Sequence, residues 1–276
     1  MGSSKSNAPA SGRRITLASL RKAKQEGRRF ASLTAYDASF AVLENAAGIE
    51  LILVGDSLGM VVQGHRSTIP VTMDDVVYHT RLVARGAGRA LVMGDMPFMS
   101  FATVDDARRN AARLMQEGGA EIVKLEGTGA QAETVEALSA QGVPVCAHLG
   151  LRPQAVHKLG AYKIQGREPD GAQELMDDAA ALAEAGADML LLECVPASLA
   201  KKITEHSPVP VIGIGAGVHC DGQILVLYDM LGITPGRRPS FSKDFLAEAG
   251  SIPAALEAYV EAVKSGTFPG PEHTFE

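Results

Sequence analysis

The chain has no tryptophan, and only 5% of its 276 residues are aromatic. So few flat side chains give no sign of a stacking platform for nucleic-acid bases or glycans. Basic residues are also outnumbered, because 26 Lys and Arg face 32 Asp and Glu, for a formal net charge of −6. Since no basic stripe offsets this charge, nucleic acid is excluded as the main partner.

Long apolar runs and paired cysteines are missing too. No uninterrupted apolar stretch approaches the roughly 18 residues of a membrane-spanning helix, so no membrane partner is expected. The three cysteines, Cys146, Cys194 and Cys220, have no paired or metal-type spacing, which indicates a reducing, cytoplasmic compartment. Residues 1–14 are polar and lack the apolar segment of a secretory signal. We expect a disordered leader over 1–14 and a single domain over 15–276.

Short apolar runs alternate with longer segments of helical period. Most of these runs are continuously apolar, which is typical of strands buried on both faces. An eighth run, 222–231, fits a strand or a buried helix, and its periodicity does not decide between them. The seven clear runs lie near 29–36, 50–55, 90–95, 121–126, 143–148, 188–193 and 209–214.

The segments between the runs carry helix signals. Thr72 and Thr103 are suited to cap helices over 72–87 and 103–119, each with acidic residues in its first turn. The alternation of strand and helix predicts parallel βαβ units, and the strand count favours a (β/α)₈ TIM-type barrel over an open doubly wound sheet. Residues 16–27 have helical spacing, and we expect this N-terminal helix to cover the barrel floor.

Four of the apolar runs end in a carboxylate. In a parallel barrel all strand ends meet at one rim, where active sites are built. Converging carboxylates repel one another, and a divalent cation resolves that repulsion; an all-oxygen ligand set favours Mg²⁺. Singly, each acid is better explained as a helix cap or turn residue, but caps do not require Glu, so the set predicts a metal-assisted site. The four acids are Asp56, Asp95, Glu126 and Glu193.

Other polar residues fall at the same rim. Lys124 shares a strand face with Glu126, so either it holds a substrate carboxylate while Glu126 serves the metal, or the two form a buried ion pair. His148 either donates to a substrate oxygen or is a structural histidine. Ser57 offers its hydroxyl and amide to an anion or to a turn. GIGAG at 213–217 lies where barrels often bind phosphate, but it lacks the dinucleotide-binding spacing.

Two motifs are specific enough to suggest a family, VGDSLGMVVQGH (54–65) and LLECVP (191–196), and the PVCAHLGLRPQ motif (144–154) accompanies them. With the sequence around them, from Thr16 to the C-terminus, they resemble the ketopantoate hydroxymethyltransferase (3-methyl-2-oxobutanoate hydroxymethyltransferase) family. The resemblance implies a (β/α)₈ barrel that transfers a hydroxymethyl group from 5,10-methylenetetrahydrofolate to 3-methyl-2-oxobutanoate. The product, 2-dehydropantoate, serves pantothenate biosynthesis.

The resemblance also implies roles for individual positions and for the assembly. It places Mg²⁺ on Asp56, Asp95 and Glu126, and the general base on Glu193. It implies a homodecamer of two stacked pentameric rings. Substrate contacts carry over to Asp56, Ser57, Asp95 and Lys124, to which the position of His148 at a strand end adds a further candidate.

The implied reaction runs through a Mg²⁺-stabilised enolate of the keto acid. Glu193 takes the proton beside the ketone, and its apolar surroundings at 190–192 are expected to raise its pKa. Two alternatives remain. One is a lyase or mutase similar to the phosphoenolpyruvate mutase and isocitrate lyase group, although those lyases commonly carry a K-x-C-G-H-type loop that this sequence lacks. The other is a non-catalytic barrel that binds a metabolite and needs no base.

Overall fold

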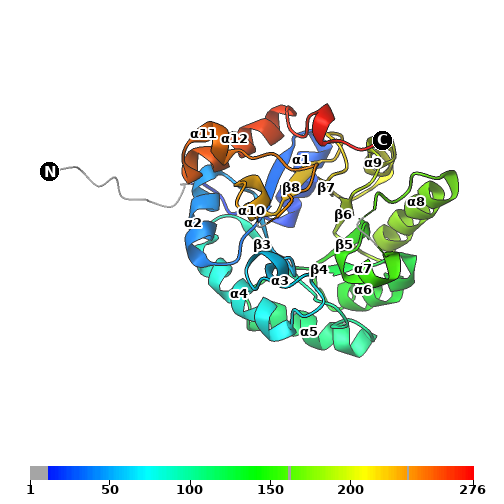
Figure 1. Cartoon of the computed structure of the whole chain (residues 1–276). Helices are drawn as coiled ribbons and strands as arrows, with labels where there is room; N and C mark the ends of the chain where they lie inside the picture. The colour runs from blue at the N-terminus through cyan, green and yellow to red at the C-terminus, as the bar shows by residue number, and fades with distance from the viewer. Residues whose placement is uncertain (1–11, 161–162, 235) are drawn as a thin grey trace.

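A computed structural model describes residues 12–160, 163–234 and 236–276 (Figure 1). Most of the predicted leader therefore lies outside the described residues. Eight parallel strands close into a barrel in sequential order, as the sequence predicts. The strands are β1 (Phe30–Thr34), β2 (Leu51–Val54), β3 (Leu91–Asp95), β4 (Ile122–Glu126), β5 (Val145–Gly150), β6 (Met189–Glu193), β7 (Val211–Ile214) and β8 (Gly222–Leu225).

Helices form a ring around these strands (Figure 1). Short 3-10 turns η1 (Gly129–Gln131), η2 (Pro153–Ala155) and η3 (Pro271–His273) add to them. The helices are α1 (Leu17–Gln25), α2 (Ala38–Ala47), α3 (Leu58–Val61), α4 (Met73–Gly86), α5 (Val104–Gln116), α6 (Ala132–Ser139), α7 (Val156–Leu159), α8 (Pro169–Glu184), α9 (Ala197–His206), α10 (Leu227–Met230), α11 (Leu246–Ala249) and α12 (Ile252–Ser265).

The two predicted threonine caps are confirmed. Thr72 Oγ1 accepts a hydrogen bond from the backbone N–H of Asp75 at the start of α4. Thr103 Oγ1 does the same for Asp106 at the start of α5. Each cap satisfies a backbone donor that the first helical turn leaves without a partner, and so fixes where the crossover helix begins.

Helix α1 covers the floor of the barrel, meaning the amino ends of the strands. Leu20 and Ala23 are buried on its inner face. Lys24 Nζ lies 2.9 Å from Asp221 Oδ2, immediately before β8, and Arg21 pairs with Asp188, immediately before β6. The opposite mouth of the barrel is left for the site.

The ambiguous segment 222–231 contains both a strand and a helix. β8 pairs with β1, with Phe30 opposite Gly222, and α10 begins two residues after β8 ends. A Cβ atom on Gly222 would lie 2.4 Å from the Phe30 ring, so glycine is what allows the last strand to approach the first. Because each element is only four residues long, neither is long enough to show a helical or strand-like hydrophobic periodicity in the sequence.

The sequence predicted neither a disulfide bond nor a membrane-spanning helix. All three cysteines are free and buried. Within the described ranges, no helix combines the length and apolarity that crossing a bilayer requires.

Tyr259 on α12 ties the closing strands together. Its fully buried hydroxyl donates to the carbonyl oxygens of Ser32 on β1 (2.9 Å) and Gln223 on β8 (3.1 Å). We predict that Tyr259→Phe lowers the free energy of unfolding by about 1–2 kcal/mol, because a buried hydrogen bond is lost without relief of packing. Urea unfolding followed by circular dichroism measures this. Tyr78→Phe, at a side chain 51% exposed, is the matched control and should change nothing; equal losses would contradict the role of Tyr259.

Candidate active site

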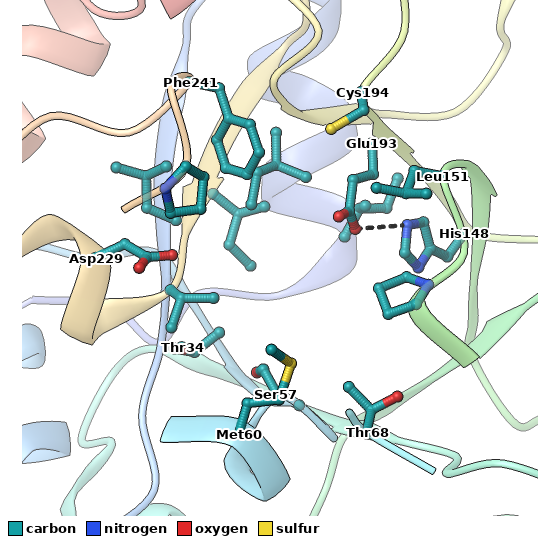
Figure 2. Close-up of a pocket in the computed structure, with 18 of the residues that line it drawn as sticks. Thr34, Ser57, Met60, Thr68, His148, Leu151, Glu193, Cys194, Asp229 and Phe241 are labelled. Atoms are coloured by element: carbon teal, nitrogen blue, oxygen red, sulfur yellow. Dashed lines mark ion pairs between the residues drawn. The ribbon is translucent and has the colours of Figure 1, made fainter. Parts of the chain in front are cut away.

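A cavity of about 1440 Å³ opens at the carboxyl ends of the strands. Figure 2 shows its walls, with His148 and Glu193 on one side and Thr34 and Asp229 on the other. Strand polarity explains the gathering, because residues that are far apart in the sequence all follow the same end of a strand. Every site residue named from the sequence lines the cavity: Asp56, Ser57, Asp95, Lys124, Glu126, His148 and Glu193.

Asp95 is the centre of the polar cluster at the bottom of this cavity. Its Oδ1 accepts from Lys124 Nζ at 2.6 Å, and its Oδ2 accepts from the backbone N–H of Asp56 at 3.1 Å. Asp95 and Lys124 lie opposite each other on β3 and β4, and their side chains are 1% and 5% exposed. The buried partner of Lys124 is thus Asp95 rather than Glu126.

Gln154 connects two of the carboxylates, and sequence reasoning missed it. Its Nε2 donates to Asp56 Oδ2 at 2.8 Å and to the carbonyl oxygen of Met96 at 3.0 Å. Its backbone N–H donates to Glu126 Oε2 at 3.1 Å. Gln154 reaches the site from η2, a turn after β5. The only signal was its position in the PVCAHLGLRPQ motif, directly after Pro153.

His148 lies between the two glutamates. Its Nε2 is 3.2 Å from Glu193 Oε2 (dashed in Figure 2), and its Nδ1 is 3.7 Å from Glu126 Oε1. Neither nitrogen has hydrogen-bond geometry with a described residue. Burial, together with the positive charge of Lys124, lowers the pKa of His148 well below its usual value, so the imidazole is neutral.

Ser57 lies at the turn that its position allowed, and its contact with an anion stays a prediction. It precedes α3, and its Oγ lies 2.8 Å from the hydroxyl of Tyr36. The hydroxyl pair lies beside Asp56 at the edge of the cavity, which Ser57 lines. Tyr36 itself was not identified from the sequence, because the search for site residues followed the carboxylates at strand ends.

Burial dominates the electrostatics of the acids. It raises the pKa of Asp56 to about 7, assisted by the nearby charge of Asp95, and it raises the pKa of Glu126 well above its usual value. Burial likewise raises the pKa of Glu193 to about 8. Burial acts to lower the pKa of Lys124, but the surrounding carboxylates outweigh this effect and raise it. Lys124 therefore stays charged. The cavity bottom is a place where additional positive charge is favourable.

The donor set suits a hard cation that keeps open positions. In the part of the chain that the structure describes, no three His, Cys, Asp or Glu side chains are arranged to hold a metal by themselves. Asp56 and Asp95 are neighbours in space, because the backbone N–H of Asp56 donates to Asp95 Oδ2. Glu126 Oε1 is buried without a hydrogen bond to a described residue. Mg²⁺ is commonly held by one or two carboxylates, with water and substrate completing its octahedron. The residues therefore fit Mg²⁺ without forming a complete cage.

A (β/α)₈ barrel with buried acids, a lysine and a neutral histidine at its carboxyl mouth has the architecture of the barrel enzymes. Comparison with known proteins is more specific. The model of the ketopantoate hydroxymethyltransferase family matches residues 14–271, and the chain belongs to this family.

Curated relatives agree over nearly the whole length. A protein of Alkalilimnicola ehrlichii named 3-methyl-2-oxobutanoate hydroxymethyltransferase is 60% identical over 267 residues, 97% of this chain and 96% of the relative. A protein of the same name from Nitrosococcus oceani is 60% identical over 256 residues, 93% of this chain and 97% of the relative.

Solved structures share the fold at low identity. Phosphonopyruvate hydrolase aligns with a TM-score of 0.61 at 17% identity, covering 86% of this chain and 89% of that one. Oxaloacetate acetylhydrolase in complex with the product oxalate aligns with a TM-score of 0.60 at 14% identity, covering 91% and 97%. At such identities the likeness concerns the barrel alone.

The Asp95–Lys124 pair makes a thermodynamic prediction. Asp95→Asn leaves a buried ammonium without its anionic partner, and we expect the free energy of unfolding to fall by about 3 kcal/mol. Adding Lys124→Met should recover most of this loss, because the unpaired charge is gone. Urea unfolding of the single and double variants measures both effects.

Asp74→Asn is the matched control for this pair. Its carboxylate pairs with Arg113 but its side chain is 84% exposed, and the loss should stay below about 1 kcal/mol. If Asp95→Asn lowers the free energy of unfolding no more than Asp74→Asn does, the buried Asp95–Lys124 pair is not what neutralises the cavity bottom.

Proposed function

We propose that this cavity transfers a hydroxymethyl group from 5,10-methylenetetrahydrofolate to 3-methyl-2-oxobutanoate, forming 2-dehydropantoate for pantothenate biosynthesis. Family membership supports the activity, and one observation supports the chemistry. All four strand-end carboxylates, with Lys124 and His148, line the same cavity. Such a set can bind an α-keto acid and remove a proton from the carbon next to its ketone.

We assign a resident Mg²⁺ to Asp56 and Asp95, with Glu126 beside them. When bound, it would polarise the keto oxygen of the substrate and stabilise the negative charge that develops there. Two observations support a cation at this place: the pKa of Asp56 is raised, and Glu126 Oε1 has no hydrogen-bond partner among the described residues.

The other residues have separate tasks. Lys124, held in place by Asp95, is positioned to offer its charge to the substrate carboxylate, and Ser57 contributes a hydroxyl. Glu193 removes the C3 proton, and its raised pKa makes it a stronger base once it is ionised. The neutral imidazole of His148 lies beside that carboxyl and limits where it can point.

The electron pair of the broken C–H bond then forms the new carbon–carbon bond. The C3 carbon of the enolate attacks the folate methylene group, one carbon–nitrogen bond of the folate breaks, and its electrons return to nitrogen. Water then adds its oxygen to the transferred carbon as the second carbon–nitrogen bond breaks. The proton taken by Glu193 and one proton of the water end on the two folate nitrogens, which releases tetrahydrofolate. The homodecameric assembly and the cytoplasmic location that the family resemblance implies stay predictions.

Glu193→Gln tests the base. We predict that it abolishes exchange of the C3 proton of 3-methyl-2-oxobutanoate with deuterated solvent, measured by proton NMR, because the amide accepts no proton. Binding of the keto acid, followed by calorimetry, should persist. Glu257→Gln, at an exposed position on α12, is the control and should exchange normally. Normal exchange by Glu193→Gln would refute the base assignment, whereas exchange by the wild-type protein no faster than in protein-free solution would favour a non-catalytic barrel.

Stability in the presence of Mg²⁺ should depend on pH. Burial raises the folded-state pKa of Asp56 to about 7 and that of Glu193 to about 8, so the folded protein binds more protons than the unfolded chain over this range. Stability without metal therefore falls as the pH rises from about 4 toward 8. Mg²⁺ binds the ionised carboxylates of the folded state. We predict that it raises Tm more at about pH 8 than at about pH 5.5.

Differential scanning calorimetry with and without Mg²⁺ measures these shifts. The double variant Asp56→Asn/Asp95→Asn lacks both proposed ligands and should show no Mg²⁺-dependent shift at either pH. A shift of equal size at both pH values in the wild-type protein, or one retained in the double variant, would place the cation elsewhere.

A further inference from the structure

Gln154 contacts two carboxylates of the proposed cation site from outside the cavity. It is only 6% exposed, and it is not one of the described residues that line the cavity. Asp56 and Glu126, to which it donates, do line the cavity. Gln154 can therefore act on a bound cation only through these two acids.

The turn after β5 carries Gln154 to this position. Gly150 ends the strand with a φ of +87°, and a Cβ atom there would lie 2.3 Å from the carbonyl oxygen of Glu193. Glycine thus lets the chain turn against β6, where the backbone N–H of Leu151 donates to the same carbonyl oxygen at 2.8 Å. Pro153 then begins η2, which connects β5 to α7 (Figure 1). The backbone that carries Gln154 is therefore held to the barrel.

The side-chain amide of Gln154 uses both of its N–H bonds. Nε2 donates to Asp56 Oδ2 at 2.8 Å and to the carbonyl oxygen of Met96 at 3.0 Å. Both partners only accept hydrogen bonds, so the nitrogen of the amide must face them. Met96 is fixed in turn, because its backbone N–H donates to the carbonyl oxygen of Lys124 at 2.8 Å and continues the pairing of β3 with β4. Asp56 Oδ2 is thereby tied to the sheet.

Each acid of the cation site has at least one oxygen already engaged. Gln154 takes Oδ2 of Asp56 with its side chain and Oε2 of Glu126 with its backbone N–H, the latter at 3.1 Å. The other oxygen of Glu126, Oε1, has no hydrogen-bond partner among the described residues. Asp95 accepts from Lys124 Nζ and from the backbone N–H of Asp56. The acids are thus restrained from turning both oxygens toward one cation.

Coordination through one oxygen distinguishes Mg²⁺ from Ca²⁺. Mg²⁺ demands near-ideal octahedral geometry, and the two oxygens of a single carboxylate lie too close together to fill two corners of an octahedron. Ca²⁺ is larger, takes about six to eight oxygen ligands, and accepts a carboxylate through one oxygen or through both. A device that holds back one oxygen of each carboxylate therefore favours Mg²⁺ over Ca²⁺.

We propose that Gln154 is a positioning residue that selects the cation, because it holds Asp56 Oδ2 and Glu126 Oε2 so that each carboxylate presents a single oxygen. This inference rests on the proposed function, from which it takes the Mg²⁺ at Asp56 and Asp95. It adds a source of metal preference in a residue that contacts neither the metal nor the substrate. A role in stability alone would weaken the binding of every cation alike, whereas selection acts on Mg²⁺ and Ca²⁺ differently.

Gln154→Met tests the selection, because methionine has a similar length but no N–H to donate to Asp56. We expect the Kd of Mg²⁺, measured by calorimetric titration of the full chain with the metal alone, to rise about tenfold. The Kd of Ca²⁺ should rise less than about twofold, because a freed Asp56 can bind it with both oxygens. The ratio of the Ca²⁺ Kd to the Mg²⁺ Kd should therefore fall about fivefold or more.

Gln173→Met is the matched control. Gln173 lies on α8, is exposed, and also donates from its amide to an aspartate, Asp177 Oδ1, at 2.8 Å. Its replacement should leave both Kd values unchanged. Gln154→Asn is a second test variant, whose amide is one methylene too short to reach Asp56, and it should lower the ratio as Gln154→Met does. Circular dichroism reports whether each variant is folded.

The outcomes separate this inference from the function on which it rests. An equal rise in both Kd values in a folded Gln154 variant, or no change in either, overturns the selection. A crystal structure of the wild-type protein with Mg²⁺ tests it without a substitution. Asp56 Oδ2 should stay on Gln154 Nε2 while Oδ1 contacts the cation, and a cation bound by both oxygens of Asp56 overturns the proposal. If the wild-type protein binds Mg²⁺ no better than Asp56→Asn/Asp95→Asn does, the proposed cation site itself is wrong.

Discussion

The site depends on one constraint: several carboxylates are brought together inside the protein, and their charge must be balanced there. The closed parallel barrel imposes the gathering, because the carboxyl ends of all eight strands meet at the same mouth. The buried Asp95–Lys124 pair at 2.6 Å supplies part of the balance. Burial raises the pKa values of Asp56 and Glu193, so proton uptake by these two carboxyl groups removes more of the negative charge. A cation would complete it.

This balance gives the cavity two different halves. The bottom is acidic, buried and fixed by strand ends, and it suits a small anion that arrives with a metal. The outer half is lined mainly by loops and by the C-terminal segment, with basic residues and the exposed acid Glu168 among them. Loops can change their contacts without disturbing the barrel, so the fold can keep its strand-end site while the residues at the mouth vary.

Much of the fold and of the cavity bottom could be predicted from the sequence. Continuous apolar runs identified seven strands, and Thr72 and Thr103 marked two helix starts, because both signals are local. The strand-end acids could be grouped because parallel strands share one polarity. Gln154, Tyr36 and the Phe241–Phe275 contact could not be found in this way. Gln154 and Tyr36 contact residues that line the cavity, and the two phenylalanines line it themselves, through turns and long-range packing that leave no period in the sequence.

The central claim is that Asp56 and Asp95 hold one cation beside a keto acid whose C3 atom faces Glu193. A crystal structure of the protein soaked with Mg²⁺ and 3-methyl-2-oxobutanoate tests this most directly. The account predicts a cation at about 2.1 Å from an oxygen of each aspartate, with the keto acid between it and Glu193. A cation bound elsewhere, or a keto acid whose C3 atom points away from Glu193, would contradict it.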